Sequence, residues 1–289
     1  MTTVLGIIGG SGIYDIDCLE NPQWITVESP FGTPSDDLLV GTLNNVKMVF
    51  LPRHGRDHVQ TPSSINYRAN IDALKRAGVT DVISVSACGS FRDELVPGNF
   101  VIIDQFIDRT FNRKKSFFGP GCVAHVSVAN PTCSRLGAAC FEAAKAEGIF
   151  VHNGGTYLAM EGPQFSTLAE SKLYRENWGC DVIGMTNMPE AKLAREAELC
   201  YASIAMITDY DSWHPDHGEV DVTKIIETLK GNSAKAKGLL ARLPEILGDV
   251  HKDCPYSCDK ALEFAILTQP DGRDAKLVAN LDAVAGRVL

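Results

Sequence analysis

The chain has 289 residues, 45% of them hydrophobic and 22% charged, so it can bury a large core in one α/β domain or two smaller ones. Its formal net charge of −9 argues against general binding to nucleic acid or anionic membranes, since both attract basic patches. No apolar run is long enough to span a bilayer, and the first basic residue is Lys47, so the charged start of a signal peptide is missing. We therefore expect a cytoplasmic protein.

The chain contains nine cysteines, which is a high number and an odd one, so they cannot all be paired within the chain. Several of them lie in apolar stretches, which is typical of core-filling thiols in a reducing compartment. Cys254 and Cys258 differ, because they lie close together in a polar segment. This pair could form a disulfide, provide half of a metal site or have no function, and the sequence leaves these three alternatives open. Since no second pair of comparable spacing completes a zinc site, the sequence predicts no metal centre.

The first element is an apolar strand from Val4 to Ile8 that runs into Gly9-Gly10-Ser11-Gly12. These glycines do not match the dinucleotide-binding fingerprint, and the lysine of a P-loop is missing. Glycines nevertheless let the backbone approach an anion, and Ser11 adds a hydroxyl beside exposed amides. A plain connection between a strand and a turn is the alternative.

Arg53 and His54 follow the fourth predicted strand, just before Gly55. This position suits an anion site, because arginine offers a two-pronged donor to phosphate. His54 and His58 have the spacing of a helical metal-binding pair, but Pro52 and Gly55 disfavour a helix here.

Further strands and helices alternate along the rest of the chain. We expect strands over 24–27, 38–43, 46–51, 79–87, 100–107, 181–186 and 199–207, and helices over 63–77, 133–147, 167–178 and 222–247, with another helix that begins near Asn187. Thr167 and Glu170 have the spacing of a capping box. This order predicts an α/β fold with a ligand crevice at the carboxyl ends of the strands. Without an internal repeat or a low-complexity linker, a single domain is favoured.

Asp209 and Asp211 follow the apolar run that ends at Ile207. On an extended backbone, positions two apart point to the same side, so both carboxyl groups can face one ligand. A buried acid pair needs compensation by a metal, by basic neighbours or by a ligand rich in donors. The alternative is a polar strand end with both acids in water.

Six segments together resemble the trimeric purine nucleoside phosphorylase family, and most closely its branch that cleaves 5′-methylthioadenosine. They are Ile7–Gly12, Pro52–Gly55, Ala87–Ser90, Glu161–Ser166, Gly184–Glu190 and Thr208–Asp211, in the family's order between Val4 and about Leu247. The resemblance implies a single domain with a central mixed, partly barrel-like β-sheet flanked by helices. It places the phosphorylase domain at 1–250 and a helical extension packed on the same domain at 251–289.

The resemblance also implies the site. Phosphate would bind to Ser11, Arg53, His54, Ser86, Ala87 and Thr186. Phe165 and Met185 would pack on ribose and base, and Val222, Ile225 and Ile226 would line an apolar slot for the methylthio group, although core packing is an alternative for these three. His125 would reach that slot from the next subunit of a homotrimer or of a dimer of trimers. Phosphate is a co-substrate, and no organic cofactor or metal is implied.

The negative charge that develops on the leaving purine then predicts the roles of the two acids. Asp209 would donate a proton to N7 of the leaving purine, and Asp211 would accept from the 6-amino group, which favours adenine over 6-oxopurines. The expected reaction is phosphorolysis of 5′-methylthioadenosine to adenine and 5-methylthioribose 1-phosphate. A phosphorylase for inosine, guanosine or methylthioinosine, a nucleosidase that uses water and a nucleoside-binding sensor are the alternatives.

Overall fold

A mixed sheet of eleven strands runs through the centre of the computed structural model, which describes residues 1–10, 12–14, 18–216 and 222–289. Its middle consists of the parallel strands β4 (Val46–Pro52), β1 (Val4–Gly9), β5 (Asp81–Ser90) and β11 (Cys200–Asp209). These strands are buried on both faces, so their sequences are almost continuously apolar. Antiparallel β3 (Leu38–Leu43) and β2 (Glu20–Ile25) extend the sheet beyond β4.

The other end of the sheet curls into a closed ring. β11 pairs with β6 (Phe100–Ile103), whereas β7 (Gln105–Asp108) pairs with β9 (Thr156–Ala159). β9 pairs with β10 (Val182–Gly184), and β10 returns to the carboxyl end of β5. The ring closes because β6 and β7 follow each other in the chain, which confirms the mixed, partly barrel-like sheet. A short strand, β8 (Val151–Asn153), adds to β6.

The prediction of one strand over 100–107 is therefore wrong. At Asp104 the backbone stops pairing with β11, and the Asp104 carboxylate accepts a hydrogen bond from the Gly155 amide at 3.0 Å. This change of partner lets one apolar stretch serve two sides of the ring.

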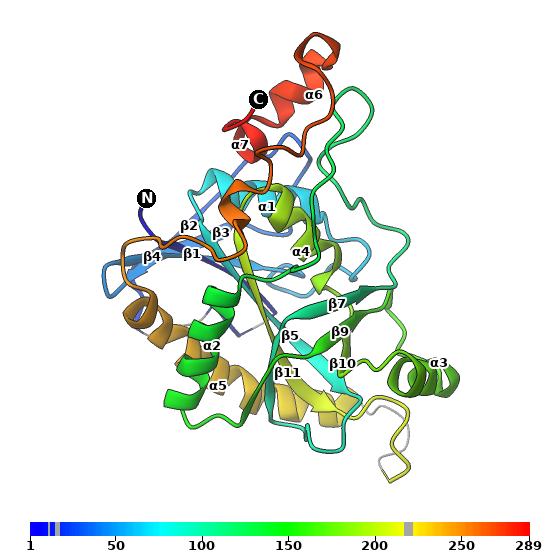
Figure 1. The fold of residues 1–289 in the computed structure, drawn as a ribbon. Helices are drawn as coiled ribbons and strands as arrows, with labels where there is room; N and C mark the ends of the chain where they lie inside the picture. Colours follow the sequence, from blue (N-terminus) through cyan, green and yellow to red (C-terminus); the bar gives the residue numbers. More distant parts are fainter. Residues whose placement is uncertain (11, 15–17, 217–221) are drawn as a thin grey trace.

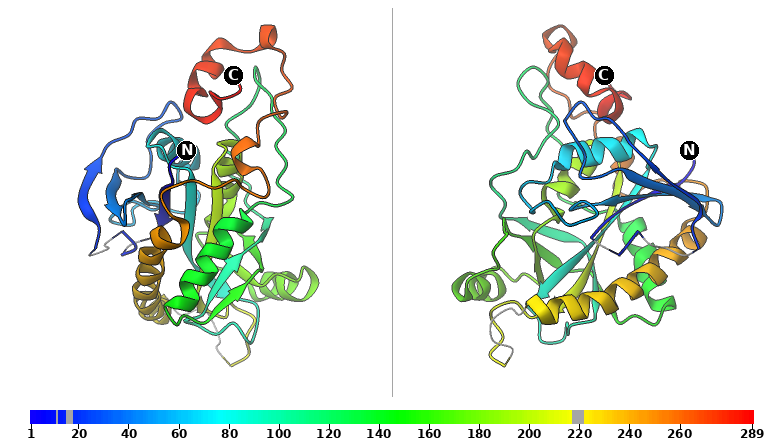
Figure 2. Two further views of the ribbon diagram at one scale, coloured as in Figure 1. Left: turned by 60° about the vertical axis from the view of Figure 1, so that its left-hand side comes forward. Right: turned by 180° about the vertical axis from the view of Figure 1, so that it is seen from behind.

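Helices cover both faces of the sheet (Figure 1). On one face α1 (Tyr67–Arg76) packs against α4 (Asn187–Glu196), and on the other α2 (Ser134–Ala146) packs against α5 (Val222–Leu247). Figure 2 shows α5 as a long rod beside α2 and the central strands. Helix α1 begins later than predicted, because residues 63–66 form a turn and Asn66 caps the helix through the Ala69 amide at 3.2 Å.

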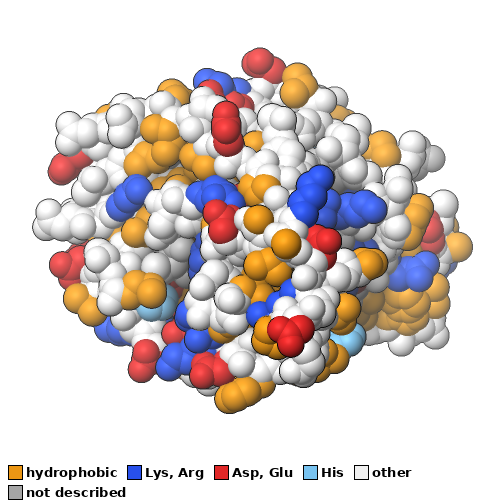
Figure 3. Space-filling view, turned by 90° about the horizontal axis from the view of Figure 1, so that it is seen from above, with side chains coloured by type: hydrophobic (Ala, Val, Ile, Leu, Met, Phe, Trp, Pro, Cys, Tyr) orange, Lys and Arg blue, Asp and Glu red, His pale blue; other side chains and the backbone are white. Residues whose placement is uncertain are grey.

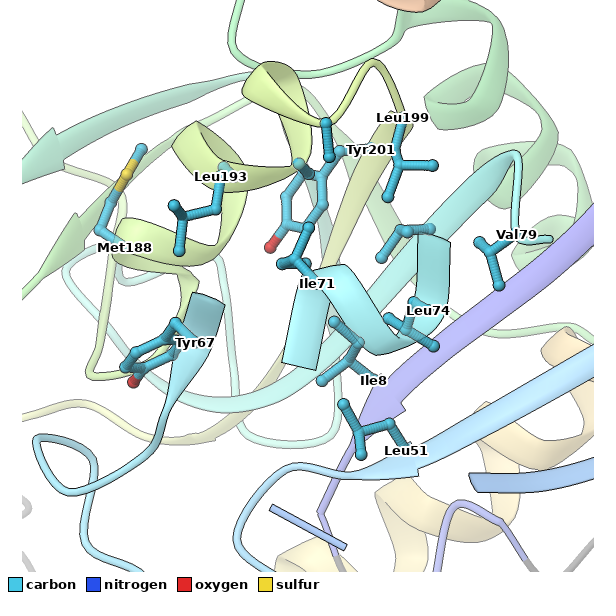
Figure 4. Packing of buried hydrophobic residues seen from close by; sticks show 14 of the residues in the cluster. Ile8, Leu51, Tyr67, Ile71, Leu74, Val79, Met188, Leu193, Leu199 and Tyr201 are labelled. Atoms are coloured by element: carbon cyan, nitrogen blue, oxygen red, sulfur yellow. The ribbon is translucent and has the colours of Figure 1, made fainter. Parts of the chain in front are cut away.

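Beneath α1 and α4 lies the larger apolar cluster (Figure 4). Ile8 and Leu51 from the strands meet Ile71 and Leu74 of α1, and all four are almost completely buried. Burying one such side chain contributes about 1.5–3 kcal/mol. This cluster fixes the strand ends that carry the candidate site.

A capping box opens α3 (Leu168–Lys172), as predicted. The Thr167 hydroxyl accepts from the Glu170 amide, and the Glu170 carboxylate accepts from the Thr167 amide. The helix then widens into a π-helical turn over Leu173–Asn177. Its single fully buried helical residue, Ser171, faces the candidate site.

The chain after α5 forms short 3₁₀ turns at Cys258–Lys260 and Pro270–Gly272, followed by α6 (Ala275–Asn280) and α7 (Asp282–Ala285). Figure 1 shows both helices in red at one end of the molecule. Leu262, Leu281 and Val284 belong to the same apolar cluster as Ile8. The domain boundary near residue 250 stays a prediction.

The surface is of mixed charge on the face shown in Figure 3, where basic and acidic side chains lie close together with hydrophobic ones between them. Among the helices of the described residues, none combines the length and the apolar character needed to cross a membrane.

Candidate active site

A cavity of about 530 Å³ opens at the carboxyl ends of the central strands. It brings together most of the predicted site residues: Arg53, His54, Ser86, Ala87, Phe165, Met185, Thr186, Asp209, Asp211, Val222 and Ile225. Ser11 lies outside the described residues, and His125 and Ile226 do not line the cavity. The volume suits a small organic ligand such as a nucleoside.

The acid pair lies at the branch point of the sheet, but not for the predicted reason. β11 ends at Asp209, and Asp211 lies beyond it with a left-handed backbone (φ +51°), so strand alternation does not place the two carboxyl groups. Both line the cavity because the neighbouring β5 carries Gly89. A Cβ there would lie 2.9 Å from Asp209 Oδ1 and 3.2 Å from Asp211 Cβ.

The two acids have different surroundings. Burial raises the pKa of Asp209, although hydrogen bonds from the Thr208 hydroxyl and the Asp211 amide, each 2.7 Å long, oppose the shift. Asp211 Oδ2 accepts hydrogen bonds from the hydroxyls of Ser166 and Ser171. Asp209 is therefore suited to hold a proton, whereas Asp211 is fixed as an oriented acceptor.

The sequence did not predict that Ser166 and Ser171 donate hydrogen bonds to Asp211. The signal was present, because the capping box at Thr167 sets the first turn of α3 and thereby points Ser171 inward. Only the tertiary structure brings that turn to Asp211.

Arg53 does not offer phosphate the two-pronged edge that we expected. Its Nε and Nη2 atoms donate to the Glu190 carboxylate at 3.0 and 3.3 Å, and Nη1 donates to the Val85 carbonyl at 3.0 Å. Both side chains of this ion pair are 2% exposed. A buried guanidinium needs an anionic partner within the protein, and here Glu190 is that partner, so Arg53 has no free pair of donors to offer to phosphate.

His54 is a neutral acceptor at the cavity. Its Nδ1 lies 2.8 Å from the Gln60 carbonyl and therefore carries the proton, which leaves Nε2 as the acceptor. Burial, followed by the charges of Arg53 and His58, lowers its pKa to about 4. The rings of His54 and His58 stack with centroids 4.3 Å apart, so His58, which we considered only as a metal ligand, instead helps to line the cavity.

Small and hydroxyl-bearing residues complete this end of the cavity. Ala87 is the exposed position in the otherwise buried β5, so the strand opens onto the cavity there. Ser86 donates to the Asn187 side chain at 3.1 Å, and Thr186 precedes α4. Amides and hydroxyls in this arrangement suit a phosphate-sized anion.

The apolar wall comes from the first turns of α5. Val222, Ile225 and Leu229 line the cavity, together with Met206 and Ile13. Ile226, which the prediction included, does not line the cavity. Positions 222 and 229 are about two helical turns apart, so 222, 225 and 229 lie on one face, whereas residue 226 lies at its edge.

His125 lies in a segment that pairs with the C-terminal part of the chain. Its amide donates to the Ala265 carbonyl at 2.9 Å, and a β-bridge joins Ala124 to Ile266. The contact of His125 with a neighbouring subunit stays a prediction.

Comparison with known proteins places the chain in a family. Residues 4–244 match the model of the phosphorylase superfamily. An S-methyl-5′-thioadenosine phosphorylase from Cereibacter sphaeroides is 67% identical over 100% of this chain and 99% of its own length.

Two solved structures support the same assignment. A methylthioadenosine phosphorylase from an Antarctic soil metagenomic library is 42% identical, with a TM-score of 0.92 over 98% of both chains. A variant of the Schistosoma mansoni adenosine/methylthioadenosine phosphorylase in complex with methylthioadenosine is 33% identical, with a TM-score of 0.79 over 98% of both chains. The chain thus belongs to the phosphorylase superfamily, within its S-methyl-5′-thioadenosine phosphorylase branch.

Proposed function

We propose that this chain cleaves 5′-methylthioadenosine with inorganic phosphate and releases adenine and 5-methylthioribose 1-phosphate. One observation carries the proposal: a single cavity joins an acid pair to an end lined by His54, Ser86, Ala87 and Thr186. The names of the relatives, and the methylthioadenosine bound in one of them, support the same substrate.

The reaction breaks the bond between C1′ and N9 and forms a bond between C1′ and a phosphate oxygen. The sugar becomes cation-like, and the purine leaves as an anion unless it gains a proton. Asp209, whose raised pKa favours the protonated form, gives that proton to N7. Positioned proton transfer of this kind accelerates reactions by about 10²–10⁴-fold.

Phosphate binds in the part of the cavity lined by His54, Ala87 and Thr186. The neutral His54 accepts through Nε2 from a protonated phosphate oxygen, and the Thr186 hydroxyl donates to another oxygen, whereas the Ser86 hydroxyl donates to Asn187. The buried ion pair of Arg53 and Glu190 lies behind them and holds the strand ends in place. Met185 and Phe165 pack on the nucleoside, and Val222 and Ile225 receive the methylthio group.

Asp211 selects the base by accepting from the 6-amino group of adenine. Replacing it by asparagine puts an amide donor at this position, which suits the oxygen of a 6-oxopurine. We expect Asp211→Asn to raise the ratio of kcat/KM for methylthioinosine to kcat/KM for methylthioadenosine by at least tenfold. Ser171→Ala, which removes only one hydroxyl from Asp211, is the control and should leave the adenine preference in place. An unchanged ratio in Asp211→Asn would show that another group reads position 6.

The decisive experiment compares initial rates with and without phosphate. We expect turnover of methylthioadenosine to require phosphate and to exceed that of methylthioinosine. Turnover that persists without phosphate would identify a nucleosidase, and faster turnover of the inosine analogue would identify a 6-oxopurine phosphorylase. Binding of methylthioadenosine without turnover would identify a sensor. Equal rates before and after removal of organic cofactors by gel filtration would support phosphate as the sole co-substrate.

The active assembly that we propose is a homotrimer, or a dimer of trimers, with His125 reaching a neighbouring site. Support comes from exposed apolar side chains beside the segment that carries His125. Phe264 is 93% and Leu267 57% exposed, and the Leu267 amide donates to the Val123 carbonyl at 2.9 Å. Exposed apolar groups of this size are typical of subunit interfaces.

A further inference from the structure

Four cysteines from distant parts of the chain meet beneath the C-terminal segment. Cys133 precedes α2, Cys200 begins β11, and Cys254 and Cys258 lie after α5. All four are buried, and their sulfur atoms lie within 4.8 Å of one another. The prediction of no metal centre rested on the missing second cysteine pair, and the fold supplies that pair from two separate elements.

We propose that these four cysteines bind one zinc ion. Zinc favours four thiolates at the corners of a tetrahedron, and a Zn–S distance of about 2.3 Å places the sulfur atoms about 3.8 Å apart. Cys254 Sγ lies 3.4 Å from Cys133 Sγ and 2.9 Å from Cys258 Sγ. A compact group of this size fits a single ion, whereas a two-iron cluster spreads its four sulfur ligands over two metals.

A disulfide is the alternative for this group. The 2.9 Å between Cys254 Sγ and Cys258 Sγ is longer than a disulfide bond, which measures about 2.05 Å. Two disulfides would use the four sulfurs in pairs, whereas here Cys254 lies close to both Cys133 and Cys258. A shared central partner explains why all four converge.

The surroundings provide positive charge for a site whose four thiolates and one Zn²⁺ sum to −2. Arg135 pairs with Asp81, and its buried Nε has no hydrogen-bond partner among the described residues. Arg135 lies in the first turn of α2, two residues after Cys133, so this cation lies beside the cluster. A thiolate accepts hydrogen bonds from such donors, which are common around metal-bound sulfur.

A second cation lies near the group. Arg195 is 5% exposed and donates to the carbonyls of Asn130 and Tyr256, three residues before Cys133 and two before Cys258. Basic side chains beside thiols favour the deprotonated form that a metal requires.

The site is structural rather than catalytic. Four protein ligands close the tetrahedron and leave no position for water or substrate. None of the four cysteines lines the active-site cavity. The ion instead fastens residues 254–258 to the start of β11 and to α2.

Metal analysis of the full chain, purified without an affinity tag from cells grown with zinc, tests the proposal. We expect one zinc ion per chain in the wild type and less than a tenth of that in Cys254→Ala. Cys140→Ala removes a buried thiol from α2 outside the group and should keep the full zinc content. Replacement by Co²⁺ should produce the visible bands and the near-ultraviolet charge-transfer band of tetrahedral cobalt thiolate.

A second measurement needs no variant and so does not depend on whether the variants fold. Thiol titration of the denatured, zinc-stripped wild type should find nine free thiols per chain, the full cysteine count. Fewer thiols, with a disulfide among these four cysteines in mass spectrometry, would overturn the proposal. A wild-type zinc content below a tenth of an ion per chain would also overturn it.

Discussion

At the residue scale, the surroundings of the carboxyl groups of Asp209 and Asp211 differ. Asp211 is held by two serine hydroxyls, whereas the pKa of Asp209 is raised by burial. The raised pKa therefore makes Asp209 the candidate general acid.

We expect Asp209→Asn to lower kcat by about 10²–10⁴-fold, because an amide cannot release a proton to N7. In the wild type, kcat should fall as pH rises through the raised pKa of Asp209, since only the protonated form acts. The variant should lack this decline. Rates from pH 5 to 9 measure it, and an unchanged alkaline decline in Asp209→Asn would assign the titration to another group.

His54 makes stability depend on pH. Its pKa is about 4 in the folded chain, and the ordinary value near 6.5 applies when the chain unfolds. Between these values the unfolded state binds more protons, so stability falls as pH falls. From pH 7 to 5 this single group contributes a loss of about 2 kcal/mol.

Urea unfolding at both pH values, in buffer without phosphate, measures this effect. The wild type should lose about 2 kcal/mol more than His54→Asn on going from pH 7 to 5. His152→Asn, which alters an exposed histidine, should behave like the wild type. Equal losses in the wild type and His54→Asn would contradict the prediction.

At the element scale, close approaches between strands depend on glycine. A Cβ on Gly184 of β10 would lie 2.0 Å from the Tyr157 hydroxyl, whose side chain is fully buried. We expect Gly184→Ala to cost about 1–3 kcal/mol of unfolding free energy, since neither strand has room to move. Activity should fall as well, because Met185 and Thr186 follow directly.

Gly231→Ala in α5 is the matched control. Nothing lies within 4 Å of its added Cβ, so this change should be neutral or stabilise the helix by up to about 1 kcal/mol. Denaturant unfolding of both variants measures the contrast. Similar losses of unfolding free energy in Gly184→Ala and Gly231→Ala would show that the close contact with Tyr157 does not cause the destabilisation.

Much of the fold could be predicted at this scale, because periodicity and caps are local. The long apolar runs of β5 and β11 and the capping box of α3 were evident in the sequence. The break at Asp104 was not, because apolar residues resume at Phe106 and Ile107 and only the distant β9 explains the change of partner.

The candidate site could likewise be predicted only in part. Motifs predicted which residues line the cavity, but not that Glu190 occupies the donors of Arg53 or that two serines hold Asp211. The four-cysteine group was missed because its members lie up to 125 positions apart (258 minus 133) and meet only in the folded chain.

At the scale of the whole molecule, the exposed apolar side chains near His125 predict an assembly that one substitution can weaken. We expect Phe264→Asp to shift the protein from trimer towards monomer in sedimentation velocity. The specific activity should then fall on dilution, because each site would lose the neighbouring subunit's residue.

Phe150→Asp is the control, since it places the same charge at another exposed phenylalanine, 65% accessible and directly before β8. It should sediment like the wild type. A Phe264→Asp protein that keeps its trimer would place the interface elsewhere.

The ring of strands also sets the earliest point in synthesis at which the sheet can close. β5 is complete by residue 90, but its long partner β11 starts only at Cys200, and the ring cannot close before β11 has been synthesised. Contacts between segments so far apart in sequence form slowly. While the chain grows from residue 90 to residue 209, the apolar flank of β5 must therefore wait for its partner and is exposed to aggregation.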